Sequence, residues 1–286
     1  MNETAVLLID CPDRKGLVPR VSGLLYEKGA EVLSTDFHRD ATLGLFFMRM
    51  EWGLIQNGSL FDLNGFRRDF APLAEELGMR WSLTSNASPM RVALFCSQQL
   101  HCIGDLLHRW YQGEMRCNIP VIVSNHRLVE RLAEFYGIPF AHTPMTERAK
   151  KASEEQQLEL LQEHKVELVV LARYMQIVPP AFVARYPQKI INVHHSFLPS
   201  FTGAKPYHAA FVRGVKLIGA TSHYVNDELD TGAIIEQEVE RISHRDQVEN
   251  LVARGRDLER VVLSRAVRWH LERRILCYAN KTVIFD

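Results

Sequence analysis

The sequence is poor in the features that mark several large classes of protein. Its 286 residues include five cysteines, and no two of them form a CxxC pair: Cys11, Cys96, Cys102, Cys117 and Cys277. This number and spacing argue against a disulfide framework and against a CxxC zinc site. No run approaches the roughly 20 apolar residues of a membrane span, and the N-terminus carries no export signal. We therefore expect a cytoplasmic protein without a membrane contact.

An excess of charge of either sign is also absent. Lys and Arg together number 34, and Asp and Glu together also number 34. A balanced chain creates no field that would draw it to nucleic acid, so no nucleic-acid partner is expected. Hydrophobic residues make up 47% of the chain, which is enough for a substantial core. Because the length exceeds the usual size of one domain, two domains are predicted.

The first domain is predicted over residues 1–83 from the order of its elements. Residues 4–10 form a short apolar run, and the turn-forming string CPDRKG leads into a helix that ends near Gly29. Two alternating segments, EVLSTDFHRD and LGLFFMRMEW, precede a helix over residues 61–77 and a last strand, MRWSLT. This βαββαβ order predicts a ferredoxin-like α/β domain. The small, polar string TSNASP predicts a linker over residues 84–89.

The second domain is predicted over residues 90–286. Short runs of Val, Ile and Leu alternate there with helical stretches, and the main runs are RVALFCS, IPVIVSN, VELVVLARY and KIINVHH. Strands that are apolar on both faces and alternate with helices predict a mostly parallel, Rossmann-like sheet. Its functional site is expected at the carboxyl ends of these strands.

Two clusters of side chains that can donate, accept or transfer protons lie in this domain. In the first, INVHHSFLPSFTGAKPYH, one residue separates Asn192 from His194, so both side chains point to the same side of a strand. In the second, SHYVNDELDTGAIIEQ, a strand with His223 leads into a polar loop at Asp230. An amide and an imidazole could thus face one reacting centre. The carboxylate of Asp230 could reach them only through the fold.

These strings resemble the signatures of the folate-dependent formyltransferase family, in which Asn-x-His precedes Ser-Leu-Leu-Pro and, downstream, His and Asp-x-Gly. LARYMQIVP, residues 171–179, is similar to that family's folate-contacting strand and loop. Three ordered motifs at compatible spacing are far more specific than one. Because the N-terminal domain also resembles an ACT regulatory domain, the chain is most similar to the formyltetrahydrofolate deformylases within that family.

The resemblance implies a role for each residue of the site. Asn192, His194 and Asp230 would be catalytic: Asn192 would stabilise the formyl oxygen, His194 would move protons, and Asp230 would orient that imidazole and position water. His195 and His223 would support them. The substrate-binding residues would be Tyr174, Met175, Gln176, Ile177, Asn226 and Leu229.

The implied activity is hydrolysis of 10-formyltetrahydrofolate to formate and tetrahydrofolate, a reaction connected with purine synthesis. The folate is then the substrate, and no tightly bound cofactor or metal is expected. The ACT resemblance further implies a homo-oligomer, either a dimer or a tetramer. It also implies an amino-acid effector, glycine or methionine, at the turn that contains Asp13 and Gly16.

Two other functions stay open at this point. The motifs identify formyl chemistry but do not separate hydrolysis from transfer to an amine acceptor, such as an amino sugar nucleotide. A glycinamide ribonucleotide transformylase would carry a Gly-rich phosphate-binding turn after its first strand, whereas this chain has Ser97-Gln98-Gln99-Leu100-His101 there. The third possibility is an ACT-based amino-acid sensor whose second domain binds folate but is inactive.

Overall fold

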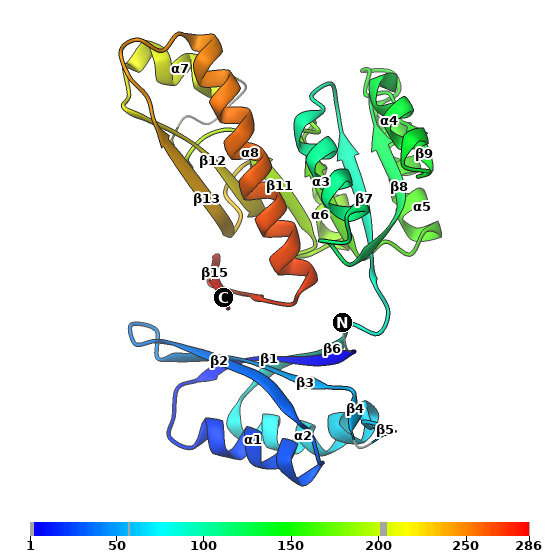
Figure 1. Cartoon of the computed structure of the whole chain (residues 1–286), viewed down its shortest axis with the longest axis vertical. Coiled ribbons are helices and arrows are strands. Elements are labelled where there is room, and N and C mark those ends of the chain that lie inside the picture. The colour runs from blue at the N-terminus through cyan, green and yellow to red at the C-terminus, as the bar shows by residue number, and fades with distance from the viewer. Residues whose placement is uncertain (1–2, 57, 201–204, 286) are drawn as a thin grey trace. The chain divides into compact units, whose positions relative to one another are not determined.

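A computed structural model of the chain describes residues 3–56, 58–200 and 205–285. Contacts within the chain divide it into two compact units, and each is described by itself (Figure 1). The first unit comprises Met1–Pro89, Arg273–Tyr278 and Val283–Asp286. The second comprises Met90–Glu272 and Ala279–Thr282.

The first unit has the predicted βαββαβ order. Four of its strands form an antiparallel sheet in the order β2-β3-β1-β6, which is the ferredoxin-like arrangement. A short hairpin of two strands, β4 and β5, which the sequence did not predict, precedes the second helix. The bounds are β1 Thr4–Pro12, α1 Leu17–Glu27, β2 Val32–Asp40, β3 Leu45–Gly53, β4 Ile55–Gln56, β5 Ser59–Leu60, α2 Leu63–Leu77 and β6 Arg80–Ser85.

Alternation along β3 explains how this sheet is covered on both faces. Met48, Met50 and Trp52 belong to the core formed with α1 and α2, whereas Phe47 points to the opposite face. There Phe47 packs against the C-terminal hairpin of β14 (Ile275–Tyr278) and β15 (Lys281–Ile284). The sequence predicts that this tail belongs to the second domain, residues 90–286. By contacts, most of it belongs to the first unit, because its apolar side chains cover that second face.

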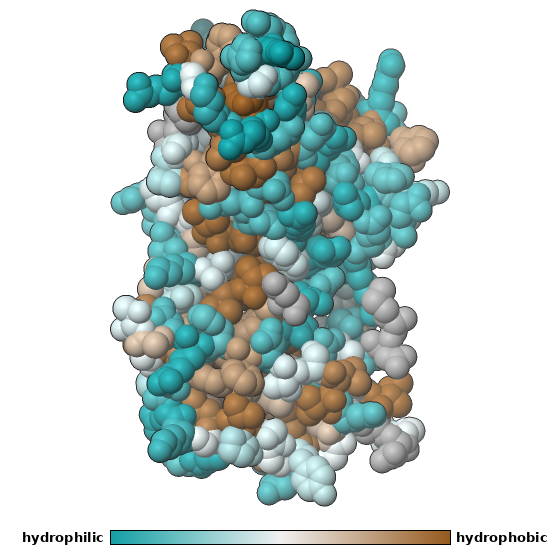
Figure 2. Space-filling model, turned by 60° about the vertical axis from the view of Figure 1, so that its left-hand side comes forward, coloured by the Kyte–Doolittle hydropathy of each residue, from teal (hydrophilic) through white to brown (hydrophobic). Residues whose placement is uncertain are grey.

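Strand β2 lies at one edge of this sheet, and nearly all of its side chains are exposed. Three of them are apolar: Val32, Leu33 and Phe37. Figure 2 shows that apolar side chains reach the surface in several separate patches on the face that it displays. An edge strand with exposed apolar side chains offers backbone groups and apolar surface for pairing with another chain.

The second unit is built on a seven-stranded sheet in the order β13-β12-β11-β10-β7-β8-β9. The five strands from β11 to β9 in that order are parallel, whereas β12 pairs antiparallel with β11 and β13 pairs antiparallel with β12. This arrangement confirms the mostly parallel sheet expected from the sequence. The strands are β7 Met90–Cys96, β8 Cys117–Ser124, β9 Phe140–His142, β10 Leu168–Ala172, β11 Ile190–His194, β12 Leu217–Tyr224 and β13 Ile234–Arg241.

Helices of the second unit connect and cover these strands. The longest, α8, runs beside β11, β12 and β13 and also contacts α3 and α7 (Figure 1). Among the described residues, no helix combines the length and apolarity that crossing a bilayer requires. The helices are α3 His101–Tyr111, the 3-10 helix η1 Arg127–Val129, α4 Glu130–Phe135, α5 Lys150–Glu163, α6 Pro180–Arg185, α7 Pro206–Arg213 and α8 Val248–Leu271.

Candidate active site

The three residues predicted to be catalytic lie together in the second unit. Asn192 and His194 end strand β11, and Asn192 stands opposite His223 in the antiparallel neighbour β12. The Oδ2 atom of Asp230 lies 3.1 Å from Nδ1 of His194, and its Oδ1 atom lies 3.7 Å from Nε2 of His223. Nδ2 of Asn192 is 3.2 Å from Nε2 of His223. The carboxylate is therefore shared by two imidazoles, one of which also contacts the amide.

The loop after β12 holds Asp230 in this place through unusual backbone geometry. Asp230 has a φ of +58°, a left-handed conformation that Asp tolerates better than most residues. A Cβ atom at Gly232 would lie 1.8 Å from the carbonyl oxygen of Tyr224, so only glycine fits there. Oδ1 of Asn226 accepts a hydrogen bond from Oγ1 of Thr231 at 3.1 Å. The spacing of the Asp-x-Gly motif thus follows from a tight return of the chain.

Hydrogen bonds assign the proton positions of the two imidazoles. Nδ1 of His223 donates to the carbonyl oxygen of Tyr224 at 2.8 Å, because a carbonyl oxygen can only accept, and Nε2 of the same ring faces both the Asn192 amide and the Asp230 carboxylate. Nδ1 of His194 donates to Asp230. Nε2 of His194 is buried and has no hydrogen-bond partner within the described part of the chain. That nitrogen is consequently the atom of the cluster with an unused hydrogen-bonding capacity.

Asp230 is held in its charged form. Burial alone would raise the pKa of its carboxyl, but the hydrogen bonds and charges of His194 and His223 outweigh burial and bring that pKa well below its usual range. An ionised carboxylate beside His194 stabilises positive charge on that ring. The cluster can therefore carry a proton on an imidazole while a reaction proceeds.

The predicted folate-contacting loop starts beside Asn192, because β10 runs parallel to β11 and its next-to-last residue, Leu171, stands opposite Asn192. Met175 and Ile177 are 49% and 65% exposed. Tyr174, which precedes both, differs: its ring is buried, and its hydroxyl accepts a hydrogen bond from Nε2 of Gln157 at 2.7 Å. The loop thus presents two apolar side chains to solvent and is anchored by the third.

The other predicted site residues surround this cluster. His195 is buried, and its ring stacks on that of His194 with 5.2 Å between centroids. Leu229 is exposed in the loop of Asp230, and Gln176 is partly buried. Residues 201–204 of the first motif lie outside the described residues. The contacts of this site with a substrate remain predictions.

The two residues predicted to bind an effector lie in the first unit. Gly16 has a φ of +87° and immediately precedes α1, which no side chain caps at this end. The carboxylate of Asp13 forms an ion pair with Arg39 of β2. The side chain of Asp13 is therefore already engaged, whereas the backbone at Gly16 is exposed.

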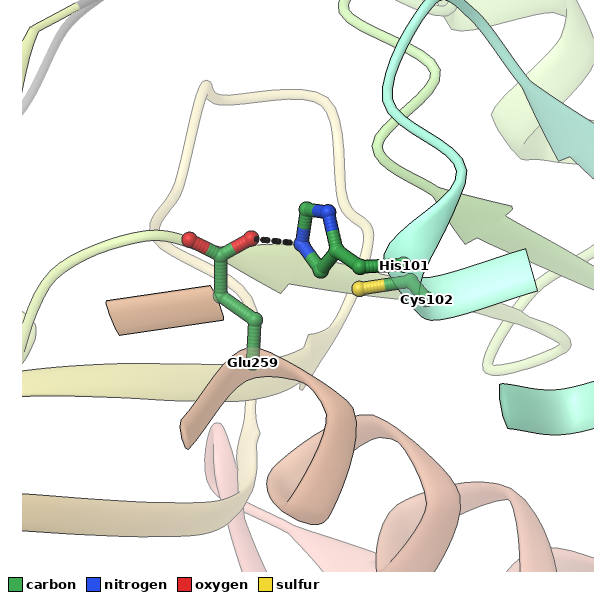
Figure 3. A group of neighbouring side chains, drawn as sticks. All are labelled: His101, Cys102 and Glu259. Carbon is green, nitrogen blue, oxygen red and sulfur yellow. Dashed lines mark hydrogen bonds and ion pairs between the residues drawn. The ribbon is translucent and has the colours of Figure 1, made fainter. Parts of the chain in front are cut away.

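A second buried polar cluster, which no sequence motif indicated, centres on Glu259. This carboxylate is 1% exposed, and it accepts hydrogen bonds from Nε2 of His101 at 2.7 Å (Figure 3) and from the hydroxyl of Tyr207 at 2.9 Å. Nε of Arg173 lies 3.4 Å from the same carboxylate. The available signal was an acidic residue among the apolar positions of α8, such as Leu258.

Part of this cluster has the composition of a metal site. The ligand atoms of His101, Cys102 and Glu259 lie within 4.8 Å of one another and form the one such group found among the described residues. Two ligands held tetrahedrally at about 2.0–2.1 Å from zinc would stand roughly 3.4 Å apart. The His101 and Glu259 atoms are 2.7 Å apart, and Arg173 adds its positive charge. The geometry is that of an ion pair rather than of a metal centre.

Comparisons with known proteins identify the family of this chain. Residues 90–267 match the formyl transferase family. The chain is 47% identical over 291 residues to a formyltetrahydrofolate deformylase of Synechocystis sp., with 99% of each chain covered. A crystal structure of a formyltetrahydrofolate deformylase from Pseudomonas syringae pv. tomato has a TM-score of 0.96 and 48% identity, covering 100% of this chain and 95% of that one.

A related enzyme of different specificity matches only part of the chain. The crystal structure of glycinamide ribonucleotide transformylase 1 from Symbiobacterium toebii has a TM-score of 0.65 and 29% identity, and it covers 69% of this chain and 95% of its own. Full-length similarity therefore extends to the deformylases, whereas the similarity to the transformylase does not. The chain belongs to the formyl transferase family and, within it, to the formyltetrahydrofolate deformylases.

Proposed function

We propose that this chain hydrolyses 10-formyltetrahydrofolate to formate and tetrahydrofolate. The observation that carries the proposal is the contact between Asp230 and His194 beside the Asn192 amide, in a chain that resembles the deformylases over its whole length. No tightly bound cofactor is part of this proposal. The folate is the substrate, and water is the nucleophile.

Asn192, His194 and Asp230 each have a different role in the hydrolysis. Water attacks the formyl carbon, the bond from that carbon to the folate nitrogen breaks, and the nitrogen receives a proton. Asn192 donates an amide hydrogen to the formyl oxygen as negative charge develops on it; removing one such donor commonly costs about 2.7–4 kcal/mol of barrier stabilisation. Nε2 of His194 exchanges protons at the tetrahedral centre. Asp230 fixes that ring and stabilises its charged form.

The folate binds between two loops in this proposal. Met175 and Ile177 pack their exposed side chains against its rings, while Tyr174 anchors the same loop from within the core. Gln176 adds a polar contact. Asn226 and Leu229, in the loop that carries Asp230, form the opposite wall.

Formate release in the absence of an amine tests this function. Purified protein is mixed with 10-formyltetrahydrofolate, and both formate and tetrahydrofolate are measured over time. Equal amounts of the two products support hydrolysis. Product formation that requires an added amine would instead identify an amine formyltransferase, and folate binding without turnover would identify the sensor.

The first unit is proposed to be an ACT domain that regulates the second. Its ferredoxin-like sheet and the exposed turn at Gly16 support a small amino-acid ligand there, glycine or methionine. The exposed apolar edge strand β2 supports pairing with another copy of the chain, as a dimer or a tetramer. Calorimetry with each amino acid tests the effector, and light scattering measures the oligomer. A cytoplasmic role in one-carbon metabolism and purine synthesis completes this proposal.

A further inference from the structure

Glu259 is the most deeply buried acidic side chain of the second unit and lies outside the catalytic cluster. Its carboxylate joins residues from three other segments: His101 at the start of α3, Arg173 after β10, and Tyr207 in α7. Burial alone would raise the pKa of this carboxyl, but the His101 hydrogen bond and the Arg173 charge bring it below its usual value. The charged form is thus the one that the fold stabilises.

One set of contacts, which we call the first arm, connects Glu259 through Arg173 to the folate-contacting loop. Arg173 is the first residue of that loop and has a φ of +61°, a conformation that an L-residue keeps only when its surroundings enforce it. Its guanidinium lies beside Glu259, while Tyr174, the next residue, is anchored by Gln157. Met175, also at positive φ, follows directly. The ion pair therefore fixes the point from which the loop departs.

The second arm connects Glu259 through Tyr207 and His195 to the catalytic imidazole of His194. The ring of Tyr207 lies 6.1 Å from that of His195, and His195 stacks on His194. Tyr207 reaches Glu259 because α8 carries Gly255 one turn earlier: a Cβ atom there would lie 2.1 Å from the tyrosine ring. The helix thus leaves room for the ring to lie against its backbone.

Apolar packing alone does not hold these side chains. Arg173, His195, Tyr207 and Glu259 all border a cavity of about 120 Å³. A side chain beside a cavity lacks packing contacts on that side, so its position depends more strongly on its polar contacts. The common carboxylate supplies such contacts to both arms.

We propose that Glu259 is a positioning residue that holds the folate-contacting loop through Arg173 and the catalytic His194 through Tyr207 and His195. The proposal rests on the hydrolysis proposed above. It assigns Glu259 no contact with substrate. It predicts that the two arms affect different kinetic constants, because one arm positions a binding surface and the other a reacting group.

Three variants and a control test this division. Glu259→Gln should lower kcat/KM by about 100-fold, the order of loss that small misplacements of reacting groups cause. Tyr207→Phe should lower kcat with little change in KM, and Arg173→Met should raise KM more than it lowers kcat. Glu238→Gln is the matched control, because Glu238 pairs with Arg265 of the same helix at 2.9 Å without contacting either arm. That control should keep wild-type kinetics.

A double-mutant cycle separates positioning from general destabilisation. The Glu259→Gln/Tyr207→Phe double variant should have a kcat no lower than that of Glu259→Gln, because both changes act on the same hydrogen bond, between Tyr207 and Glu259. Multiplying effects, or wild-type kinetics in Glu259→Gln, would overturn the proposal. If Glu259→Gln does not fold, as judged by circular dichroism, kcat and KM of Tyr207→Phe and Arg173→Met test the proposal instead. Wild-type values of both constants in both variants would overturn the proposal.

A spectroscopic readout keeps this inference distinct from the proposed function. The imidazole resonances of His194 should shift in Tyr207→Phe and stay unchanged in Glu238→Gln. A wild-type protein that releases no formate would reject the hydrolysis but not the positioning of His194. Unshifted His194 resonances in Tyr207→Phe would reject the positioning, whatever the activity.

Discussion

At the scale of single residues, the motifs identified the catalytic candidates but not their contacts. Asn192 and His194 share a strand, so alternation alone predicts that they point the same way. The 3.1 Å contact between His194 and Asp230 depends on the loop after β12, whose path no local pattern encodes. Glu259 was not predicted, for a related reason. Its partners come from three distant segments, and a single acidic residue on a helix carries no sign of them.

Asn192→Leu tests the amide donor. The substitution keeps a side chain of similar size but removes the hydrogen that would stabilise the formyl oxygen. We expect kcat to fall about 10²–10³-fold with KM little changed, the usual loss for one such donor. Steady-state kinetics measure both constants. Asn118→Leu, at an exposed position of β8, is the control and should leave kcat unchanged; an equal loss in that control would remove the support for a specific role.

Asp230→Asn tests the charge of the carboxylate through the pH dependence of stability. The folded state lowers the pKa of Asp230, so the charged form stabilises the fold above the unfolded pKa of about 3.9, and this contribution is lost as pH falls through the lower folded pKa. At pH 6 the variant should be less stable by about 1.5–3 kcal/mol, as for hydrogen bonds to charged groups. Urea unfolding should show this difference shrinking below about pH 4. A difference that is constant with pH would contradict the assigned charge.

At the scale of elements, strands and helices followed from periodicity, whereas the tight turn did not. Apolar runs located β7, β8, β10 and β11, because strands buried on both faces need apolar side chains throughout. The motif Asp230-Thr231-Gly232 indicated a turn and, through the family resemblance, a catalytic carboxylate, but it did not indicate the path of the chain. The structure supplies the reason for its glycine, which is the close approach of the Tyr224 carbonyl oxygen.

Gly232→Ala tests that close approach. A methyl group would collide with backbone that cannot move aside, so we expect a loss of about 1–3 kcal/mol or more in the free energy of unfolding. Turnover should fall as well, because the turn holds Asp230. Gly104→Ala in α3 is the matched control: no atom lies within 4 Å of its Cβ position, and alanine favours a helix by up to about 1 kcal/mol. Denaturant unfolding measures the free energy of unfolding of both variants. Equal values for Gly232→Ala and Gly104→Ala would contradict the steric argument.

At the scale of the whole molecule, the two-unit organisation was predicted from element order and a polar linker. The order strand–helix–strand–strand–helix–strand fits one small fold, and alternating strands and helices fit another. The destination of the C-terminal hairpin was not predictable. Its apolar residues indicate burial but do not indicate which sheet they cover, and the structure places them against Phe47.

Phe285→Ala tests the place of this hairpin. The ring is 3% exposed in the cluster with Phe47, so its removal should cost about 3–5 kcal/mol. Hydrogen exchange should show the loss of protection in β3 of the first unit. Exchange that increases in β12 instead, with β3 unchanged, would contradict the assignment of the tail.

The central claim is that His194 acts on a bound folate in a site completed by Asn192 and Asp230. The most direct measurement is the rate of formate release by His194→Asn, together with its dissociation constant for 10-formyltetrahydrofolate. Our account predicts a loss of at least about 100-fold in the rate, typical of a general acid–base, with binding within about twofold of wild type. Formate release at the wild-type rate by this variant would contradict it.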